Sequence, residues 1–299
     1  MSDGAAAPHE GEAMSSFRYE RPESVAQATA LLAAAPGRAR VLAGGTDLLV
    51  ALRAGGARPE LVVDVKRIPG IGDIAWTDGG DLVLGACALV EEIAADARVR
   101  AVFPALAEGA GAIGSLQIRW RATVGGNLAN ASPCMDTAPP LLVLDARVRV
   151  AGTGGERELP LAEFFRGVRQ TALGPGEMLV AVVVPRPAAG LRSAFAKIKR
   201  VAGHDLALVN AAAAYDPGAR TLRVAVGSCG TTPLLAPALE AIEATADPAA
   251  VGARLAELAL ARVCPIDDVR ASAEYRRDMT ARLCHRLAAR LLAGAREAS

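Results

Sequence analysis

Two glycine turns, about 80 residues apart, constrain this chain more than any other feature. The first reads Gly44-Gly45-Thr46-Asp47 and the second reads Thr123-Val124-Gly125-Gly126-Asn127. Adjacent glycines let the backbone reach positive φ and lie close to a ligand. The first turn follows an apolar run and precedes a helical-looking segment, an order that presents unpaired backbone N–H groups to an anion. Two such turns therefore predict a diphosphate held between two lobes.

The turns lack the fingerprints of the common nucleotide-binding loops. Neither ends in the Lys-Ser/Thr of a P-loop, and neither fits GxGxxG. No GxSxG elbow is present, and no histidine stands near a serine or cysteine in a motif typical of a hydrolase. Purely structural roles stay open at this point. A Gly-Gly-Asn turn is often structural, and Thr46 or Asp47 can cap a helix. Any chemistry is therefore expected from a bound cofactor.

The charge balance excludes some classes of partner. Lys and Arg number 33 against 32 Asp and Glu in 299 residues, so the formal net charge is +1. This balance gives no reason to expect nucleic acid or an acidic membrane as a partner. No stretch approaches the ~18 to 20 apolar residues of a membrane span. Residues 1–14 lack the features of a signal peptide and are predicted to be a disordered extension, so a cytoplasmic location is expected.

Cysteine and histidine usage argues against a metal or disulfide framework. The five cysteines show no CxxC spacing, and the three histidines are widely separated. A cluster or zinc site held by this chain alone is not expected. Cys87, Cys229, Cys264 and Cys284 are predicted to be small buried hydrophobes, and Cys134 to serve packing rather than chemistry.

The pattern of strands and helices predicts an α+β fold in three parts. A small β-α-β lobe is expected at residues 15–70 and a larger lobe with a mixed sheet at residues 71–187. Pro185-Arg186-Pro187 then marks a linker. An antiparallel sheet with a helical bundle is expected at residues 188–299.

The helices of the last part are predicted from composition and spacing. Thr232-Pro233 is expected to open a helix through Ala244, and a second helix is expected from Val251 to Arg262. A long final helix is expected over Ala271–Ala293. Its apolar residues recur at i+4 steps as Met279, Leu283, Leu287 and Leu291.

The motifs together resemble a known family. AGGTDL at residues 43–48, TVGGN at 123–127, SPCMD at 132–136 and a following Leu-Asp-Ala run are similar to the FAD-binding medium subunit of molybdenum hydroxylases. That family includes xanthine dehydrogenase, carbon monoxide dehydrogenase and 4-hydroxybenzoyl-CoA reductase flavoproteins. The resemblance runs from about Phe17 to Leu292. It implies a two-lobed FAD-binding domain, with FAD on this chain, followed by the C-terminal sheet and helices.

The resemblance also implies a set of cofactor-binding residues around the two turns. The segment from Val41 to Leu48 is expected to wrap the pyrophosphate, with Gly125 and Gly126 as further main-chain donors and Thr123 and Asn127 in contact with the cofactor. The members of the first segment are Val41, Leu42, Ala43, Gly44, Gly45, Thr46, Asp47 and Leu48.

Further implied residues lie outside the turns. Asp136, assisted by Ser132, is expected at the adenosine side of the cofactor, with a helix cap as its alternative role. Lys197 is expected at the pyrimidine edge of the flavin, where a cation stabilises negative charge at N1 and C2 of the reduced ring. The neighbouring Lys199-Arg200 leaves open which base reaches the ring. Ile113 and Leu179 match positions near the isoalloxazine, although core packing explains both equally well.

The function implied by the resemblance is electron transfer. A molybdopterin-binding large subunit would oxidise the substrate, and a [2Fe-2S] small subunit would pass electrons to FAD on this chain. FAD would then reduce NAD⁺, oxygen or a quinone, within a dimer of heterotrimers. No catalytic residue and no metal are expected on this chain. Only Cys134 lies between Asn127 and Asp145, so the extra iron–sulfur loop of some reductases in the family is not expected.

Two other functions fit the same motifs. One is a stand-alone FAD-dependent oxidase or reductase, which the short third part and the 3% aromatic content disfavour. The other is a cofactor-free assembly protein with the same fold, which the intact glycine turns disfavour.

Overall fold

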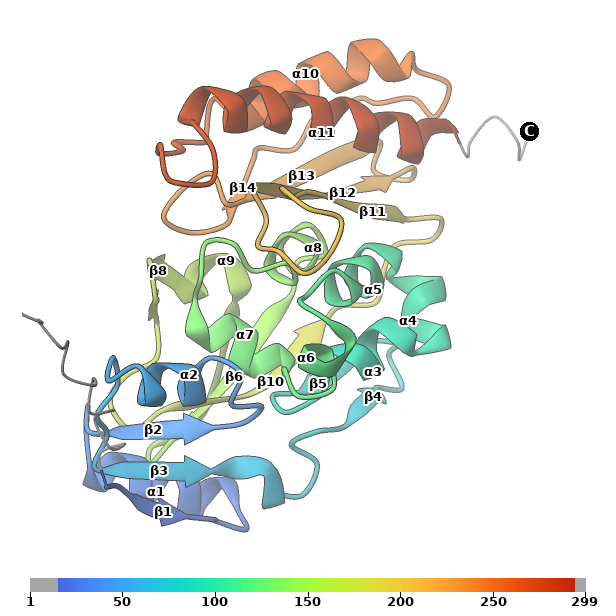
Figure 1. Cartoon of the computed structure of the whole chain (residues 1–299). Coiled ribbons are helices and arrows are strands. Elements are labelled where there is room, and N and C mark those ends of the chain that lie inside the picture. The colour runs from blue at the N-terminus through green and yellow to red at the C-terminus, as the bar shows by residue number, and fades with distance from the viewer. Residues whose placement is uncertain (1–15, 294–299) are drawn as a thin grey trace, which may run out of the picture.

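The computed structural model describes residues 16–293, and the extension predicted at residues 1–14 lies outside the described residues. Three regions follow one another from bottom to top in Figure 1, in the order of the chain. The first two share one apolar core, which also takes in Phe195, Ala212, Ala214 and Ala225 from one face of the third region's sheet. A second core lies between that sheet and its helices.

The first lobe is a three-stranded parallel sheet in the order β1-β3-β2. Its strands are β1 (Arg18–Glu20), β2 (Ala39–Leu42) and β3 (Leu61–Asp64), so β1 is a strand that the sequence analysis did not predict. The helices are α1 (Val25–Ala34), α2 (Leu48–Arg53) and the short 3₁₀ helix η1 (Val65–Arg67). The first glycine turn lies where β2 ends and α2 begins, at the carboxyl edge of the parallel strands, where ligands of open α/β sheets bind.

The second lobe is built on a five-stranded sheet in the order β4-β5-β10-β6-β7. All of its pairings are antiparallel rather than mixed. Strand β10 lies at the centre and is buried at every residue, which its unbroken apolar sequence explains. The strands are β4 (Ile74–Trp76), β5 (Leu82–Gly85), β6 (Arg147–Gly152), β7 (Gly155–Pro160) and β10 (Met178–Val184).

Short helices cover this sheet, and one of them carries the second glycine turn. Helix α7 begins at Val124, directly within the turn, and ends where Ala131 adopts a left-handed conformation. The helices are α3 (Val90–Ala95), α4 (Ala97–Val102), α5 (Pro104–Gly111), α6 (Leu116–Arg119), α7 (Val124–Asn130), α8 (Ala138–Val143) and α9 (Leu161–Phe164). A small hairpin of β8 (Phe165–Gly167) and β9 (Gln170–Thr171) follows.

The third region packs two helices on a four-stranded antiparallel sheet (Figure 1). The sheet has the order β11-β12-β13-β14, and its helices are α10 (Pro248–Leu260) and α11 (Ala273–Ala293). Leu283, Leu287 and Leu291 are buried, and Met279 packs against the same core, as the i+4 spacing predicted. The strands are β11 (Arg192–Ile198), β12 (Val209–Asp216), β13 (Thr221–Gly227) and β14 (Leu234–Leu235).

The helix predicted from Thr232 to Ala244 is wrong. This segment is extended and adds to the free edge of β13: Ala236 N–H donates to Val224 O, and Leu239 exchanges two backbone hydrogen bonds with Leu222. Pro233 and Pro237 remove two of the N–H groups that a helix would need. Hydrogen bonding to the unpaired edge of β13 therefore determines the conformation of this segment, despite its helix-forming composition.

Cysteine positions fit the sequence analysis with one exception. Cys87, Cys229 and Cys284 are buried, and burial raises the pKa of the Cys284 thiol to about 12. Cys264 is exposed, so its prediction as a buried residue is wrong. Across residues 16–293 no group of three His, Cys, Asp or Glu side chains could hold a metal ion, and no helix there is long and apolar enough to cross a membrane.

Candidate functional site

The first glycine turn presents unpaired main-chain donors. In the part of the chain that the structure describes, the N–H groups of Gly44, Gly45, Thr46 and Asp47 donate no hydrogen bond within the protein. Asp47 occupies the N-cap position of α2 but makes no side-chain cap bond, so the alternative role as a capping side chain is wrong. Position 45 requires a glycine because its φ is +77°, in the left-handed region that other residues rarely adopt. The turn therefore offers a row of donors suited to an anion such as a diphosphate.

Gly44 lies in backbone contact with the second lobe. A Cβ at Gly44 would stand 1.9 Å from Arg121 O, closer than any side-chain carbon can approach. Arg121 directly precedes the segment that carries the second turn, so this contact brings the two turns together across the lobes. The glycine is thus required by the fold itself.

The second glycine turn has its donors already committed. Gly125 N–H donates to Ala86 O at 2.9 Å, and Gly126 N–H donates to Thr123 Oγ1 at 3.1 Å. Thr123 is therefore the N-cap of α7. A Cβ at Gly125 would lie 2.6 Å from Ala86, so this glycine too serves close packing. The expectation that Gly125 and Gly126 supply main-chain donors to the cofactor is corrected, because both N–H groups bond within the protein.

Asn127 and Ser132 are also tied into local structure. Thr137 Oγ1 donates to Asn127 Oδ1 at 2.6 Å, and Cys134 N–H donates to Ser132 Oγ at 3.3 Å. The Asn127 amide nitrogen makes no hydrogen bond among the described residues, so it is the part of this side chain that can contact a ligand.

Lys197 and Asp136 form a buried ion pair between the second lobe and the third region. Lys197 Nζ lies 2.6 Å from Asp136 Oδ2, and the two side chains are 7% and 6% exposed. Lys197 Nζ also donates to Ala112 O at 3.1 Å, beside Ile113. Burial raises the pKa of the Asp136 carboxyl, and the Lys197 ammonium opposes that shift. The alternative role of Asp136 as a helix cap is wrong, because its carboxylate bonds to other groups.

This ion pair bears on the division of roles that the resemblance implies. The resemblance placed Asp136 at the adenosine side of the cofactor and Lys197 at the flavin ring. Two groups in direct contact cannot serve the two ends of one extended dinucleotide. The contact of Lys197 with Ala112, next to Ile113, favours a shared place for the pair at the flavin end.

The three bases Lys197, Lys199 and Arg200 differ in burial and in their partners. Arg200 forms a two-pronged ion pair with Asp205, and Lys199 Nζ donates to Gly203 O at 2.8 Å, both on an exposed loop. Lys197 is the base whose ammonium is buried beside Ala112. Ile113 is half-buried at this place, whereas Leu179 is 5% exposed within β10, so core packing is the role that the structure supports for Leu179.

Two polar groups of the site escaped the sequence analysis. Lys66 Nζ donates to Ala43 O at 3.2 Å and pairs with the buried Asp64, whose carboxylate also accepts from Tyr19 Oη. Burial raises the pKa of Asp64, but the hydrogen bonds from Lys66 and Tyr19 outweigh it and leave that pKa lowered. A Val-Asp-Val-Lys sequence gives no sign that its lysine lies under a turn 20 residues earlier.

The second polar group that the sequence analysis missed is Asn210 of β12, which is completely buried and donates a hydrogen bond to Asp136. The pair is 74 residues apart in sequence, and a lone Asn inside an apolar strand carried no motif.

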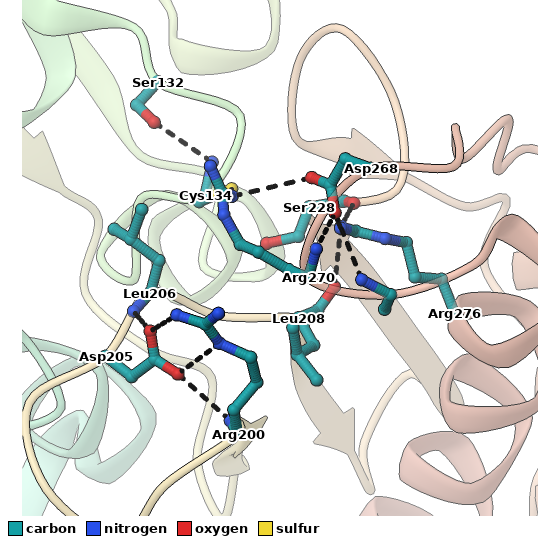
Figure 2. Close-up of polar contacts among 11 residues, drawn as sticks. Ser132, Cys134, Arg200, Asp205, Leu206, Leu208, Ser228, Asp268, Arg270 and Arg276 are labelled. Atoms are coloured by element: carbon teal, nitrogen blue, oxygen red, sulfur yellow. Dashed lines mark hydrogen bonds and ion pairs between the residues drawn. The ribbon is translucent and has the colours of Figure 1, made fainter.

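Cys134 lies at the edge of a separate polar cluster (Figure 2). Arg276 is buried and holds the third region together by donating to Leu208 O and Ser228 O, and Asp268 pairs with it at 2.8 Å. Arg270 extends from this cluster to Cys134 Sγ at 3.9 Å (Figure 2). These contacts join loops of two regions and give Cys134 a packing environment.

The residues fit a flavin dinucleotide. The free N–H row from Gly44 to Asp47, with Lys66 beside it, is suited to the diphosphate. The buried Lys197 uses two of the three N–H bonds of its ammonium on Asp136 and Ala112, which leaves one for a ligand near Ile113. Bound FAD supplies a carrier that takes up and releases electrons. When FAD is bound, the donor row from Gly44 to Asp47 and the Lys197 ammonium are the groups of this chain that would hold it.

Two family models together match almost the whole chain. Residues 15–187 match "FAD binding domain in molybdopterin dehydrogenase", and residues 193–291 match "CO dehydrogenase flavoprotein C-terminal domain".

Individual relatives agree with these models. The carbon monoxide dehydrogenase medium chain of Hydrogenophaga pseudoflava is 32% identical over 284 residues, covering 90% of this chain and 95% of the relative. The xanthine dehydrogenase FAD-binding subunit of Escherichia coli O157:H7 is 32% identical over 266 residues, covering 86% and 90%. A solved structure of the H. pseudoflava carbon monoxide dehydrogenase superimposes with a TM-score of 0.85 at 32% identity, covering 91% of this chain and 95% of that one.

Proposed function

Because the chain belongs to the FAD-binding medium subunits of the molybdenum hydroxylases, we propose that it passes electrons from a [2Fe-2S] subunit through its FAD to NAD⁺, oxygen or a quinone. The chain is an oxidoreductase subunit with FAD as its cofactor. The partners belong to the proposal: a molybdopterin-binding large subunit and a [2Fe-2S] small subunit, assembled as a dimer of heterotrimers in the cytoplasm. The family's oxidation of the substrate would then take place on the large subunit.

The observation that carries the proposal is the buried ammonium of Lys197 beside Ala112 and Ile113. A reduced flavin carries more negative charge than an oxidised one, so a fixed cation at its ring favours the reduced form. The effect is larger in a buried place than in water. A site of this kind supports electron storage between arrival and departure, which an electron-transfer subunit requires.

The division of the chain is proposed together with this function. Residues 15–187 would form the FAD-binding domain, with lobes at 15–70 and 71–187, and residues 188–299 the C-terminal domain. The second core, which consists of residues of the third region alone, supports it.

The experiment is a half-reaction measured on the chain reconstituted with FAD. The flavin is reduced anaerobically and mixed in separate runs with NAD⁺, a soluble quinone and oxygen, and reoxidation is followed by absorbance. We expect rapid reoxidation by one of the three and release of FAD on denaturation. Failure to bind FAD, or release of FMN, would overturn the proposal.

A control variant tests the observation on which the proposal rests. Lys197→Met keeps the length of the side chain and removes its charge, so its FAD should become harder to reduce. An unchanged midpoint potential in this variant would remove the support that Lys197 gives to the proposal.

A further inference from the structure

We propose that Asn210 is a positioning residue for the flavin site, which fixes the Asp136 carboxylate and through it the Lys197 ammonium. The inference rests on the proposed role of Lys197 beside the flavin and extends it to a residue of β12 that contacts no cofactor itself.

Asn210 makes its two hydrogen bonds across the boundary between the second lobe and the third region. Its side-chain nitrogen donates to Asp136 Oδ1 at 2.7 Å and to Met135 O at 3.1 Å. Both partners are acceptors, so the orientation of the amide follows from its surroundings. Asp136 Oδ1 is thereby held by the amide and Asp136 Oδ2 by Lys197. The carboxylate is thus fixed from both sides and cannot rotate without losing a buried hydrogen bond.

The other end of the Asn210 side chain shows that this arrangement has a cost. Its Oδ1 is buried and makes no hydrogen bond among the described residues. An unsatisfied buried acceptor costs stability, and an apolar residue would avoid that cost in a strand where Val209 and Ala211 flank the position. An asparagine at this place is therefore explained by what its amide nitrogen holds.

Gly227 makes room for this side chain. It pairs with Asn210 across the β12–β13 ladder, and a Cβ there would lie 2.1 Å from Asn210 Oδ1. The backbone of Gly227 has no positive φ that would call for glycine, so space is the reason for it. Asn210 and Gly227 therefore act as a matched pair, in which the glycine lets the amide reach Asp136.

The consequence reaches the flavin end through the lysine. Lys197 Nζ has two acceptors within the described residues, Asp136 Oδ2 and Ala112 O. If the carboxylate rotates away, Ala112 O remains as the one group holding the ammonium. The cation then loses its fixed place beside Ile113, and its favourable interaction with reduced flavin weakens.

The test compares four variants of the full chain reconstituted with FAD. Asn210→Ala removes the amide, and Gly227→Ala displaces it without altering Asn210. Lys197→Met removes the cation. Ser193→Ala is the matched control, since Ser193 Oγ accepts from Ala105 N–H at 3.3 Å in another buried bond across the same boundary, away from Asp136. The measurements are the FAD midpoint potential, the dissociation constant of FAD and the unfolding midpoint.

We expect Asn210→Ala and Gly227→Ala to lower the FAD midpoint potential, in the same direction as Lys197→Met but by less. Their FAD dissociation constants should rise by about tenfold, the scale of one buried charged hydrogen bond. Ser193→Ala should lower the unfolding midpoint and leave the potential unchanged.

The outcomes test the role of Lys197 at the flavin separately from the role of Asn210 in holding it there. If Lys197→Met shifts the potential and Asn210→Ala leaves it unchanged or raises it, Asn210 is only a bond of the domain boundary and the inference falls. If Lys197→Met has no effect, the proposed role of Lys197 fails, and the inference fails with it. If Gly227→Ala behaves like Ser193→Ala while Asn210→Ala does not, the matched-pair argument is wrong.

Discussion

The two glycine turns look alike in sequence and differ in what their main chains do. Among the described residues, the N–H groups of the first turn, from Gly44 to Asp47, have no hydrogen-bond partner. In the second turn, Gly125 N–H donates to Ala86 O and Gly126 N–H donates to Thr123 Oγ1. The first turn is therefore free to bind an anion, and the second packs within its own lobe against Ala86. Similar motifs thus divide into a ligand-binding turn and a structural turn. Each prediction below would break or sharpen that division.

The largest effect is expected from a side chain at Gly44. Gly44→Val would place a carbon 1.9 Å from Arg121 O, and two backbones cannot move apart without separating the lobes. We expect a loss of at least about 3 kcal/mol in the free energy of unfolding, measured by urea denaturation. Gly154→Ala is the control, because nothing lies within 4 Å of its Cβ position. A Gly44→Val protein with unchanged stability that fails to bind FAD would show that this glycine serves the ligand alone.

The next effect concerns Asp64, which holds Lys66 under the first turn. Asp64→Asn should lower stability at neutral pH by about 2 kcal/mol, since hydrogen bonds to a buried charge are lost. The folded pKa of Asp64 is lowered, so its contribution is present above the ordinary carboxyl pKa of about 4 and disappears as the pH falls through the folded value.

Denaturation curves at several pH values test this sign. The difference in the free energy of unfolding between wild type and Asp64→Asn should shrink as the pH is lowered. The exposed control Asp78→Asn should unfold with nearly the same free energy as wild type throughout. A difference that stays constant down to acid pH would contradict the assigned role of the charge.

A smaller effect is expected from the cap of the second turn. Thr123→Ala removes the acceptor of Gly126 N–H and should cost about 1 kcal/mol of stability, while Thr123→Ser should keep most of it. Thermal unfolding of the two variants distinguishes them. If both variants keep their stability and lose FAD, the second turn would be a binding turn after all.

The smallest effect is expected from Lys66, which is 37% exposed. Lys66→Met should raise the FAD dissociation constant by about fivefold, with less effect at high salt because an exposed charge is screened. Arg67→Met, on the same 3₁₀ helix, is the matched control. Fluorescence titration at two salt concentrations measures both, and equal effects of the two variants would reduce Lys66 to part of a general positive charge.

Local patterns predicted a large part of the fold. The two turns and the apolar stripe of α11 follow from glycine pairs and i+4 spacing. The segment after Thr232 was not predictable in this way, because its conformation is set by the free edge of β13. Neither was β1, a strand of three residues that depends on its pairing with β3.

The resemblance named a set of candidate site residues and said little about how they lie relative to one another. The resemblance brought in Asp136 and Lys197, but their contact joins positions 61 residues apart and no spacing rule reveals it. Whether an N–H group is free depends on the carbonyl that meets it, and Ala86 O meets Gly125 only in the folded lobe. Two turns of similar sequence therefore differ in whether their backbone N–H groups are free for a ligand. The sequence of the turn alone does not reveal this difference.

The buried ion pair has a consequence for the order of events during synthesis. Asp136 lies in the part of the chain made before the C-terminal region, whereas Lys197 and Asn210 are added later, on β11 and β12. A nascent chain that ends before β11 already holds the donor row of the first turn, but its Asp136 has neither partner. The buried ion pair, and with it the positive charge that we propose beside the flavin, therefore forms only after the third region has been translated.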